Sequence, residues 1–599
     1  MSFNGKILRV NLTEGSVKVE ELPKDAELYL GGRGLATKMF YDEVGPEIDP
    51  LSPENKLFFA TGPLTGTAAP TGGRYMVVTK GPLTGTIASS NSGGYFGAEL
   101  KFAGYDMIIV EGKSEKPVYL SINNEHAEIK DAEHLWGKDV FETTDKMLEE
   151  FGDKKARVAC IGPAGEKLVK FAAIMNDKHR AAGRTGVGAV MGSKNLKGIV
   201  VRGKNRPSVK VPARFMEVVK EKVKKLKENG ITGEGLPKLG TKVLDNIINQ
   251  NGLYPTNNFQ DSVFELTDEI SGEALVEKGY LIKNMPCFGC PIACGRRVTL
   301  PNGIETEGPE YETGWAFGAD CGVSDLIAIV EANHLCNQYG LDTISTGATI
   351  ACAMEMYEKG IIKKEELNNG PELKFGSSEA IVFYTKQIGM REGIGDKLAE
   401  GSYRFAESYG HPEFSMTVKK QEIPAYDPRG AQGHGLEYAT SNRGGCHVRG
   451  YMISPEILGA PEKLDPQVLD GKAAWVKAFQ DLTAVIDAGG LCLFTSFALG
   501  ADDYRDLINA ALGWDLSTEE LLKIGERIWN LERKFNLEAG IDPSQDTLPK
   551  RLLKEPVKEG PNKGQVVHLE QLLPKYYEIR GWNKEGKPTE EKLKELKII

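Results

Sequence analysis

The arrangement of four cysteines constrains this chain more than any other feature. Cys287, Cys290 and Cys294 follow the spacing Cys-x2-Cys-x3-Cys, and Cys492 ends the distant segment Asp487–Cys492. Three closely spaced thiolates can bind separate irons of one iron–sulfur cluster, and the fourth ligand can come from any segment that the fold brings near. The spacing therefore predicts an iron–sulfur cluster and electron transfer.

A structural zinc site is the alternative that this spacing leaves open. Zinc ribbons and knuckles usually bring a second Cys or His motif close by, and none follows Cys294. The spacing therefore favours a cluster over zinc. The fourth ligand is open as well, because five other cysteines are available: Cys160, Cys321, Cys336, Cys352 and Cys446. Of these, Cys160 and Cys352 lie in apolar stretches, which predicts small core residues.

A repeated motif favours Cys492 among these candidates. The segments Asn337–Asp342 and Asp487–Cys492 share the pattern Asx-x-x-Gly-Leu-x. Each lies where a helix is expected to end on a glycine, and one copy alone would be an ordinary helix end. Two copies, one of them carrying a candidate cluster ligand, predict a pair of ligand-binding segments.

Composition and charge narrow the class of protein. The 599 residues are 40% hydrophobic and 26% charged, which is typical of a soluble globular protein with several domains. The net charge of −10 argues against nucleic acid as a partner, because phosphate binding needs a positive surface. We expect neither a signal peptide nor a membrane span, since the longest apolar stretch, 484–501, is interrupted by Asp487 and glycines. A cytoplasmic location and reduced cysteines are therefore expected.

Hydrophobic periodicity predicts an α+β fold. Residues 1–208 contain short β-type runs separated by Gly and Pro turns, which predicts a β-sheet base domain. Two mainly helical domains are expected to follow at 209–416 and 417–599. The clearest predicted strands are 56–60, 75–79, 107–110 and 198–201, with a hairpin at 11–19. The clearest predicted helices are 213–230, 325–339, 346–359 and 396–409.

Six further segments carry a resemblance to a known family. They are APTGGRY at 69–75, NSGGYFGAEL at 91–100, NDKHRAAGR at 176–184, ETEGPEYE at 305–312, YDPRG at 426–430 and RGGCH at 443–447. With these motifs and the cysteines, the chain resembles the tungsten-containing aldehyde ferredoxin oxidoreductases over nearly its whole length. The choice of tungsten over molybdenum is implied by this resemblance alone.

The resemblance implies a particular set of cofactors at the domain interface. Two pterin dithiolenes would hold one tungsten, a magnesium ion would bridge the pterin phosphates, and a [4Fe–4S] cluster would lie beside one pterin. The cluster ligands would be Cys287, Cys290, Cys294 and Cys492, while no side chain would bind tungsten. The backbone carbonyls of Asn91 and Ala181 would lie near magnesium.

The chemistry of the remaining motif residues agrees with such cofactors. A pterin edge of N–H donors is suited to carboxylate acceptors, for which Asp342 and Asp487 are the candidates. Phosphates are suited to arginines and to backbone N–H groups exposed at glycines. The full set of predicted cofactor contacts is Arg74, Asn91, Gly93, Arg180, Ala181, Gly183, Arg184, Asn337, Leu341, Asp342, Arg443, Gly444, Arg449, Asp487, Cys492 and Leu493.

Two positions in this set depart from the family pattern. Asn337 stands where the pattern has Asp, so one charge-assisted contact becomes neutral at a cost of about 1–2 kcal/mol, and binding is expected to survive. Arg449 stands where a relative would carry Lys, which keeps the charge but changes the reach of the side chain.

Two residues are predicted to handle protons. The resemblance places Glu312 and His447 at the tungsten centre, and both can titrate usefully when buried. Glu312 is expected to activate water or the substrate hydrate, and His447 to donate a hydrogen bond. A solvated acidic loop remains the alternative for Glu312, and a polar core residue the alternative for His447.

The implied function is aldehyde oxidation to carboxylic acids with ferredoxin as electron acceptor. One alternative is a related tungsten or molybdenum bis-pterin enzyme acting on formaldehyde, glyceraldehyde phosphate or a carboxylic acid in reverse. Another is a non-catalytic iron–sulfur electron-transfer protein, which would contain cluster iron without tungsten or pterin.

The resemblance also implies a homodimer, in which relatives can place an iron between subunits. Glu331 and His334 offer a Glu-x-x-His motif, but the downstream counterpart Glu379–Val382 has valine where relatives have histidine. We therefore expect Glu331 and His334 to be structural, without a bridging iron.

Overall fold

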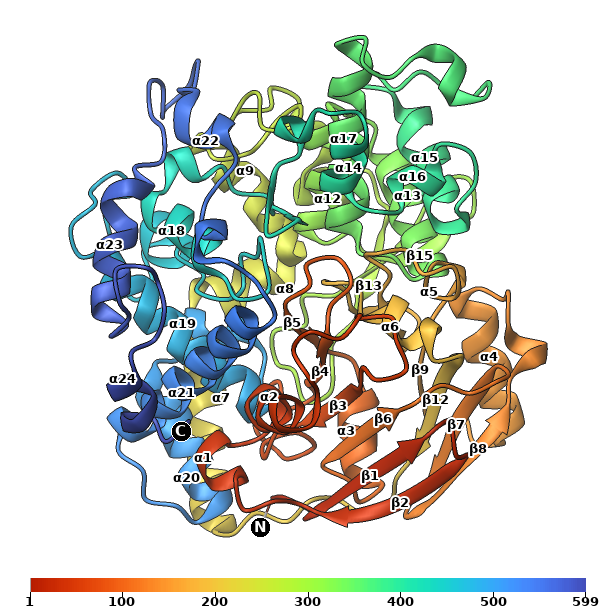
Figure 1. The fold of residues 1–599 in the computed structure, drawn as a ribbon, viewed down its shortest axis with the longest axis vertical. Helices are drawn as coiled ribbons and strands as arrows, with labels where there is room; N and C mark the ends of the chain where they lie inside the picture. Colours follow the sequence, from red (N-terminus) through yellow and green to blue (C-terminus); the bar gives the residue numbers. More distant parts are fainter. Residues whose placement is uncertain (1) are drawn as a thin grey trace.

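Two six-stranded sheets form the N-terminal part of the computed structural model, which describes residues 2–599 (Figure 1). The first sheet has the order β2-β1-β6-β3-β4-β5, and the second has the order β11-β10-β9-β12-β7-β8. The strands of the first are β1 (Lys6–Asn11), β2 (Ser16–Glu21), β3 (Leu57–Thr61), β4 (Tyr75–Lys80), β5 (Ile87–Ser92) and β6 (Met107–Glu111). Those of the second are β7 (Val118–Asn123), β8 (His126–Asp131), β9 (Arg157–Cys160), β10 (Ile174–Asn176), β11 (Arg180–Ala182) and β12 (Leu196–Arg202).

Alternation along the strands explains how the first sheet is buried on both faces. In β1, Leu8 and Val10 point into a core shared with the second sheet, whereas Ile7 points into the largest core of the molecule. Successive side chains of a strand face opposite sides, so a strand between two apolar layers is apolar on both. The two sheets therefore pack through one core, while helices cover the opposite face of the first sheet.

Helices dominate the rest of the chain, which confirms the predicted α+β fold class. The helices of the N-terminal part are α1 (Ala26–Tyr29), α2 (Gly32–Glu43), α3 (Phe96–Phe102), α4 (Val140–Phe151), α5 (Pro163–Glu166) and α6 (Val187–Ser193). Those that follow are α7 (Pro212–Glu228), α8 (Leu236–Leu239), α9 (Leu244–Gln250), α10 (Thr267–Ile270), α11 (Gly272–Glu277), α12 (Tyr311–Phe317), α13 (Leu326–Tyr339), α14 (Thr343–Glu358), α15 (Ser378–Met390), α16 (Gly395–Leu398) and α17 (Ser402–Ser408). The C-terminal helices are α18 (Gln432–Thr440), α19 (Lys472–Gly489), α20 (Ala501–Leu512), α21 (Thr518–Glu538), α22 (Lys550–Lys554), α23 (Leu569–Ile579) and α24 (Glu590–Glu595).

Two small antiparallel sheets interrupt the helical part. One consists of β13 (Leu281–Asn284), β14 (Arg296–Thr299) and β15 (Glu305–Glu307), and the other of β16 (Thr417–Val418) and β17 (Gln421–Glu422). Within the described range, 2–599, no helix is both long and apolar enough to cross a membrane. The predicted domain boundaries at 208 and 416 remain predictions.

Most of the predicted elements are present, with one helix predicted wrongly. The predicted strands correspond to β3, β4, β6 and β12, and the hairpin to β1 and β2. The segment 396–409 was expected to be one helix, but it forms α16 and the separate α17. Gly401 between them has a φ of 88°, a left-handed conformation that cannot continue a right-handed helix.

The packing of α19 against α21 positions the second motif copy, because α19 carries Asp487. Gly525 of α21 lies against the backbone of α19, so that an added methyl group would overlap the Asp481 carbonyl and lie 2.7 Å from its carbon. We expect Gly525→Ala to lower the free energy of unfolding by about 1–3 kcal/mol through overpacking, measured by chemical denaturation. Gly500→Ala is the control, because nothing lies within 4 Å of its added methyl group. Equal stability of both variants would contradict this packing.

Candidate functional site

The four predicted cluster cysteines line one cavity of about 280 Å³. Cys287, Cys290 and Cys294 lie in the loop between β13 and β14, and Cys492 lies three residues beyond Gly489, the last residue of α19. Thr71 joins the two segments, since its backbone N–H donates to Gly289 O at 2.9 Å and its Oγ1 accepts from Cys492 N at 3.1 Å. The fold thus brings the distant fourth cysteine to the other three.

The thiols surround a shared space and do not converge on one point. Within residues 2–599, no group of three or more His, Cys, Asp or Glu side chains could hold a single metal ion. Burial raises the pKa of Cys290 to about 11, with further contributions from the neighbouring thiols. Four sulfurs around one cavity suit a cluster in which each sulfur binds a different iron.

Arg74 connects this cavity to a second one. Its Nη2 donates to Cys492 Sγ at 3.1 Å, and its Nη1 donates to Asn91 Oδ1 at 3.2 Å. The second cavity, of about 250 Å³, shares Arg74, Ala181, Gly183, Cys492 and Phe494 with the first. The two cavities are therefore neighbours along a common wall.

The two cavities are lined by most of the predicted site residues. The cluster cavity also contains Gly93, Arg180, Asn337, Leu341 and Asp342, and the second cavity also contains Asn91, Arg184, Arg443, His447, Arg449, Asp487 and Leu493. Two predicted residues line neither cavity. Glu312 contacts the second cavity through His447, and Gly444 lies in a tight turn with a φ of 99°, where an added methyl group would lie 2.9 Å from Gln421 Cβ.

Both copies of the repeated motif end a helix on a left-handed glycine, as predicted. Gly340 follows α13 with a φ of 73°, and Gly490 follows α19 with a φ of 87°. Asp342 then caps the next helix, because its carboxylate accepts from the backbone N–H of Ile344 at 3.2 Å and of Ser345 at 3.4 Å. This cap explains why α14 begins at Thr343 rather than at the predicted Thr346.

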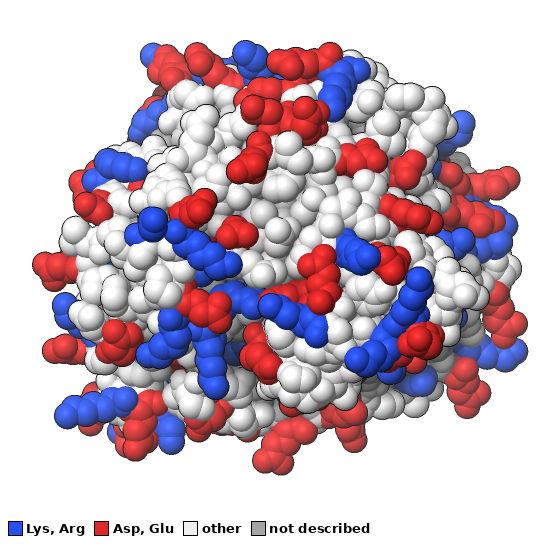
Figure 2. All heavy atoms as spheres, turned by 90° about the horizontal axis from the view of Figure 1, so that it is seen from above, with Lys and Arg blue, Asp and Glu red and all other residues white. Residues whose placement is uncertain are grey.

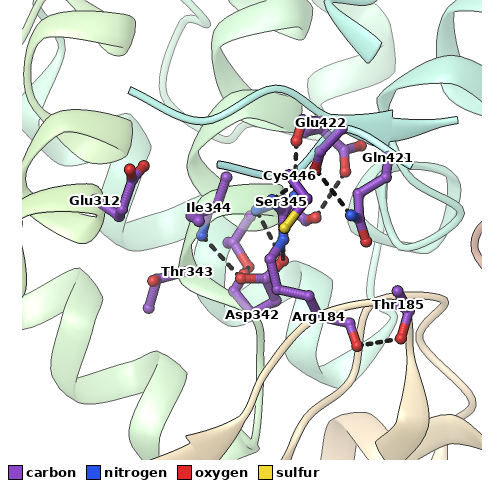
Figure 3. Close-up of polar contacts among 12 residues, drawn as sticks. Arg184, Thr185, Glu312, Asp342, Thr343, Ile344, Ser345, Gln421, Glu422 and Cys446 are labelled. Atoms are coloured by element: carbon purple, nitrogen blue, oxygen red, sulfur yellow. Dashed lines mark hydrogen bonds and ion pairs between the residues drawn. The ribbon is translucent and has the colours of Figure 1, made fainter. Parts of the chain in front are cut away.

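Arg184 ties three segments together at Asp342 (Figure 3). Its Nε donates to Asp342 Oδ2 at 3.1 Å, its Nη1 to Gly445 O at 3.0 Å and its Nη2 to Glu422 O at 2.7 Å. Arg184 of the N-terminal part thus links the first motif copy, the RGGCH segment and β17. Asn337, at the start of the same motif copy, instead donates from Nδ2 to Glu307 O at 3.2 Å.

Asp487 is the corresponding carboxylate at the second motif copy. Its Oδ1 accepts from Asn91 Nδ2 at 3.1 Å, and its Oδ2 accepts from Arg449 and, at 3.2 Å, from Arg33. A carboxylate has about four lone-pair sites, so acceptor capacity remains. Arg33 is not among the residues that the sequence predicts for the site, although it lies in a Gly-Gly-Arg-Gly run similar to the predicted glycine–arginine pairs. It is wholly buried and also pairs with Glu532 at 2.7 Å.

Glu312 and His447 form a partly buried pair. Glu312 Oε1 lies 3.4 Å from His447 Nε2, and Oε2 accepts from Ala425 N at 3.0 Å. Burial raises the pKa of Glu312 to about 8. Burial, and then the positive charge of Arg184, lowers the pKa of His447 well below its ordinary value. At neutral pH the proton therefore resides mainly on the carboxyl group, and the imidazole is neutral.

The donor set fits the cofactors that the sequence implies. Thiols surround the cluster cavity, while arginines and carboxylates surround the second cavity. Several buried polar atoms in or beside the second cavity have no hydrogen-bond partner among the described residues, namely His447 Nδ1 and Arg449 Nε of the lining and Oε1 of the adjacent Glu312. Unpaired buried groups are costly in a protein interior, which is consistent with a site built to bind a polar group.

The side chains of Glu331 and His334 have different neighbours, although the two residues are only three positions apart on α13. Glu331 lines a surface groove between α13 and α15 together with Glu379 and Val382. His334 instead packs against Phe141 of α4, with ring centroids 5.4 Å apart. The two side chains therefore serve different surfaces of this helix.

Charged side chains of both signs share the surface. On the face that Figure 2 shows, Lys and Arg side chains are interspersed with Asp and Glu side chains. This face therefore carries a mixed charge rather than a single basic field.

Known proteins resemble the chain over its whole length. Profiles described as aldehyde ferredoxin oxidoreductase match residues 7–203, as the N-terminal domain, and residues 217–598, as domains 2 and 3. A tungsten-containing aldehyde ferredoxin oxidoreductase from Pyrococcus furiosus is 63% identical over 597 residues, which cover 99% of this chain and 98% of the relative. The protein of that name from Thermococcus kodakarensis is 62% identical with the same coverage.

A solved structure resembles the fold as well. It is described as the active site complex BamBC of benzoyl coenzyme A reductase in complex with 1,5-dienoyl-CoA. It has a TM-score of 0.86 and 29% identity, and the match covers 100% of this chain and 97% of that chain.

Proposed function

The chain belongs to the aldehyde ferredoxin oxidoreductase family, and from this premise we propose that it oxidises aldehydes to carboxylic acids. Its cofactors are a tungsten bis-pterin, a magnesium ion and a [4Fe–4S] cluster. When bound, these cofactors would supply two-electron oxidation at the tungsten and one-electron transfer through the cluster. The oxidation consumes one water and releases two protons, so the protein must also move protons.

The residues of this chain have separate roles in the proposal. Cys287, Cys290, Cys294 and Cys492 hold the cluster. Glu312 takes a proton from water or from the substrate hydrate, because its Oε1 has no hydrogen-bond partner among the described residues. His447, which is neutral beside it, donates a hydrogen bond to the substrate oxygen.

The charged side chains around the second cavity are proposed to bind the pterin cofactors. Arg184, Arg443 and Arg449 contact anionic phosphates, for which guanidinium forks are well suited. Asp342 and Asp487 accept from the N–H donors of the pterins. Asn337 and Arg449 depart from the family pattern, but Asn337 still lines the first cavity and Arg449 the second.

One observation carries the proposal, namely the common wall of the two cavities. The cluster cysteines line one side, and the Glu312–His447 pair reaches the other through His447. Arg74 contacts Cys492 and Asn91, so one side chain spans from a cluster ligand to the predicted magnesium segment. Proximity of this kind suits electron transfer from a substrate centre to a cluster.

The alternatives have less support. A non-catalytic cluster protein leaves the arginine-lined second cavity without a role. Another substrate class is also less supported, because a glyceraldehyde-3-phosphate:ferredoxin oxidoreductase from Pyrococcus furiosus is only 26% identical over 424 residues. The aldehyde enzymes are 62–63% identical over 597 residues.

The proposed partners follow from the names of the relatives and from the resemblance. Ferredoxin is the proposed electron acceptor, and the chain is proposed to form a homodimer without a bridging iron. The groove between α13 and α15 supports the proposal that no iron bridges the subunits, since Glu331 and Glu379 lie there beside Val382 rather than beside a histidine. The predicted cytoplasmic location remains a prediction.

Metal and pterin analysis tests the proposal directly. Protein purified without oxygen, from cells supplied with tungsten, is expected to contain about one tungsten, about two pterins and about four irons per chain. Elemental mass spectrometry measures the metals, and fluorescence of the released oxidised pterin measures the second component. Iron without tungsten, molybdenum or pterin would contradict the proposed chemistry and leave an electron-transfer protein.

A further inference from the structure

Cys446 makes an unusual contact in the RGGCH segment. Its side chain is wholly buried, and its Sγ accepts from two nitrogens of Arg443, from Nε at 3.2 Å and from Nη2 at 3.0 Å. The third nitrogen, Nη1, donates to Ser89 O of β5 at 2.7 Å. The sulfur and this carbonyl together fix the plane of a guanidinium that lines the second cavity.

Other arginines surround the same sulfur. Burial acts to raise the pKa of Cys446, but the positive charges of Arg443, Arg449 and Arg184 outweigh it and lower the pKa below its ordinary value. Four other buried cysteines behave in the opposite way. Burial raises the pKa of each of them, Cys160, Cys321, Cys336 and Cys352.

Acidic groups on other segments near Cys446 could carry the negative charge in its place. Glu437 of α18 is wholly buried, and neither carboxyl oxygen has a hydrogen-bond partner among residues 2–599. Burial and the nearby Cys446 raise its pKa well above the ordinary value, and Glu312 and Tyr438 are raised as well. Compared with Glu437, Glu312 and Tyr438, the sulfur is the group that accepts two guanidinium donors, which favours the negative charge there.

We propose that Cys446 is a buried thiolate that positions Arg443 toward the anionic ligand of the second cavity. An ionised acceptor binds guanidinium donors more strongly than a neutral thiol does, and it keeps the fork in one orientation. The thiolate also offsets part of the charge of Arg184, Arg443 and Arg449, which are close together. This inference rests on the proposed function, in which Arg443 contacts the cofactor phosphates.

Variants that differ only in charge test this role. Cys446→Asp and Cys446→Asn are nearly equal in size, but only the aspartate can supply an anion. We expect the tungsten and pterin content of Cys446→Asn to fall by about tenfold or more relative to the parent, because a buried guanidinium loses its counter-charge. Cys446→Asp is expected to restore most of the content. Cys446→Ser, with a neutral hydroxyl, is expected to follow the asparagine variant.

Cys352→Ser is the matched control. Cys352 is equally buried, and its Sγ contacts Met356 Sδ at 4.0 Å rather than an arginine. Its cofactor content is expected to equal that of the parent, while thermal melting of every variant checks the fold.

The outcomes separate this inference from the proposed function. A full cofactor content in Cys446→Asn would overturn the inference while the parent still contains tungsten and pterin. Equal losses in the Asp and Asn variants would also overturn it, because the sulfur would then be needed for something other than charge. A parent without tungsten and pterin would instead overturn the proposed function.

Discussion

Replacing Glu312 by glutamine is expected to lower aldehyde turnover by about 10²- to 10⁴-fold, the usual contribution of a positioned general base. Glutamine keeps the size of the side chain and its place beside His447, but it cannot take a proton. The content of tungsten, pterin and iron is expected to be unchanged. Turnover is measured with a viologen acceptor, and the metals by elemental mass spectrometry on the same sample.

The pKa of Glu312 predicts how turnover depends on pH. Burial raises the pKa of Glu312 to about 8, so the carboxylate that we propose as base forms only as the pH rises through that value. Turnover of the parent is therefore expected to rise with pH up to about 8 and then to level off. A fall in turnover over this range would assign the protonated group as the active form and contradict the role of base.

The same shift predicts how stability depends on pH. The folded-state pKa of about 8 lies above the ordinary value of 4.5, so folding favours the protonated form. Glu312 therefore lowers the free energy of unfolding progressively as the pH rises from 4.5 to about 8. The glutamine variant is expected to lack this part of the dependence, which chemical denaturation at several pH values measures.

Glu305→Gln is the control for Glu312→Gln. Glu305 belongs to the same acidic segment, but its side chain is 45% exposed and pairs with Arg297 at the surface. Its turnover is expected to equal that of the parent. Loss of cofactor from Glu312→Gln would show that the residue is structural, and equal turnover of the two variants would show that Glu312 handles no proton.

Replacing Cys492 by serine is expected to change the cluster and to interrupt electron transfer. Serine removes the one proposed cluster ligand that comes from outside the segment 287–294. We expect an altered electron paramagnetic resonance spectrum and a fall of about 100-fold or more in ferredoxin reduction, because losing only the outer partners of a metal site costs 10–100-fold. Iron content and spectrum are measured on protein purified without oxygen.

Cys336→Ser is the control for Cys492→Ser. Cys336 lies in α13, and burial raises its pKa well above the ordinary value of a thiol, as expected for an inert core residue. Its cluster spectrum is expected to match that of the parent. An unaltered spectrum in Cys492→Ser would place the fourth ligand elsewhere.

Local patterns in the sequence predicted much of the fold. Alternation and turn residues predicted β3, β4, β6 and β12, since a strand buried on a sheet must place apolar side chains at a period of two. Glycines predicted the ends of α13 and α19, because a left-handed residue follows many helices. The break at Gly401 was missed, because a glycine inside an amphipathic run can either continue or end a helix.

The sequence by itself determined the types of chemistry in this protein. Three spaced thiols, two repeated motifs and several glycine–arginine pairs indicate a cluster and an anionic ligand, because each ligand requires a particular side chain. The resemblance to a family added the roles of Glu312 and His447. These inferences depend on residue identity and short spacing, which a chain displays without being folded.

Only the tertiary structure decided which distant residues meet. It brings Cys492 to the loop of Cys287, joins Glu312 to His447 at 3.4 Å, and adds Arg33 to Asp487. The pKa of Glu312 near 8 and the downward shift of the Cys446 pKa also follow from the fold. Burial acts on both groups, and Arg184, which is distant from both in the sequence, acts on both pKa values. The sequence does not display these effects, although Arg443 and Arg449 lie only three residues from Cys446.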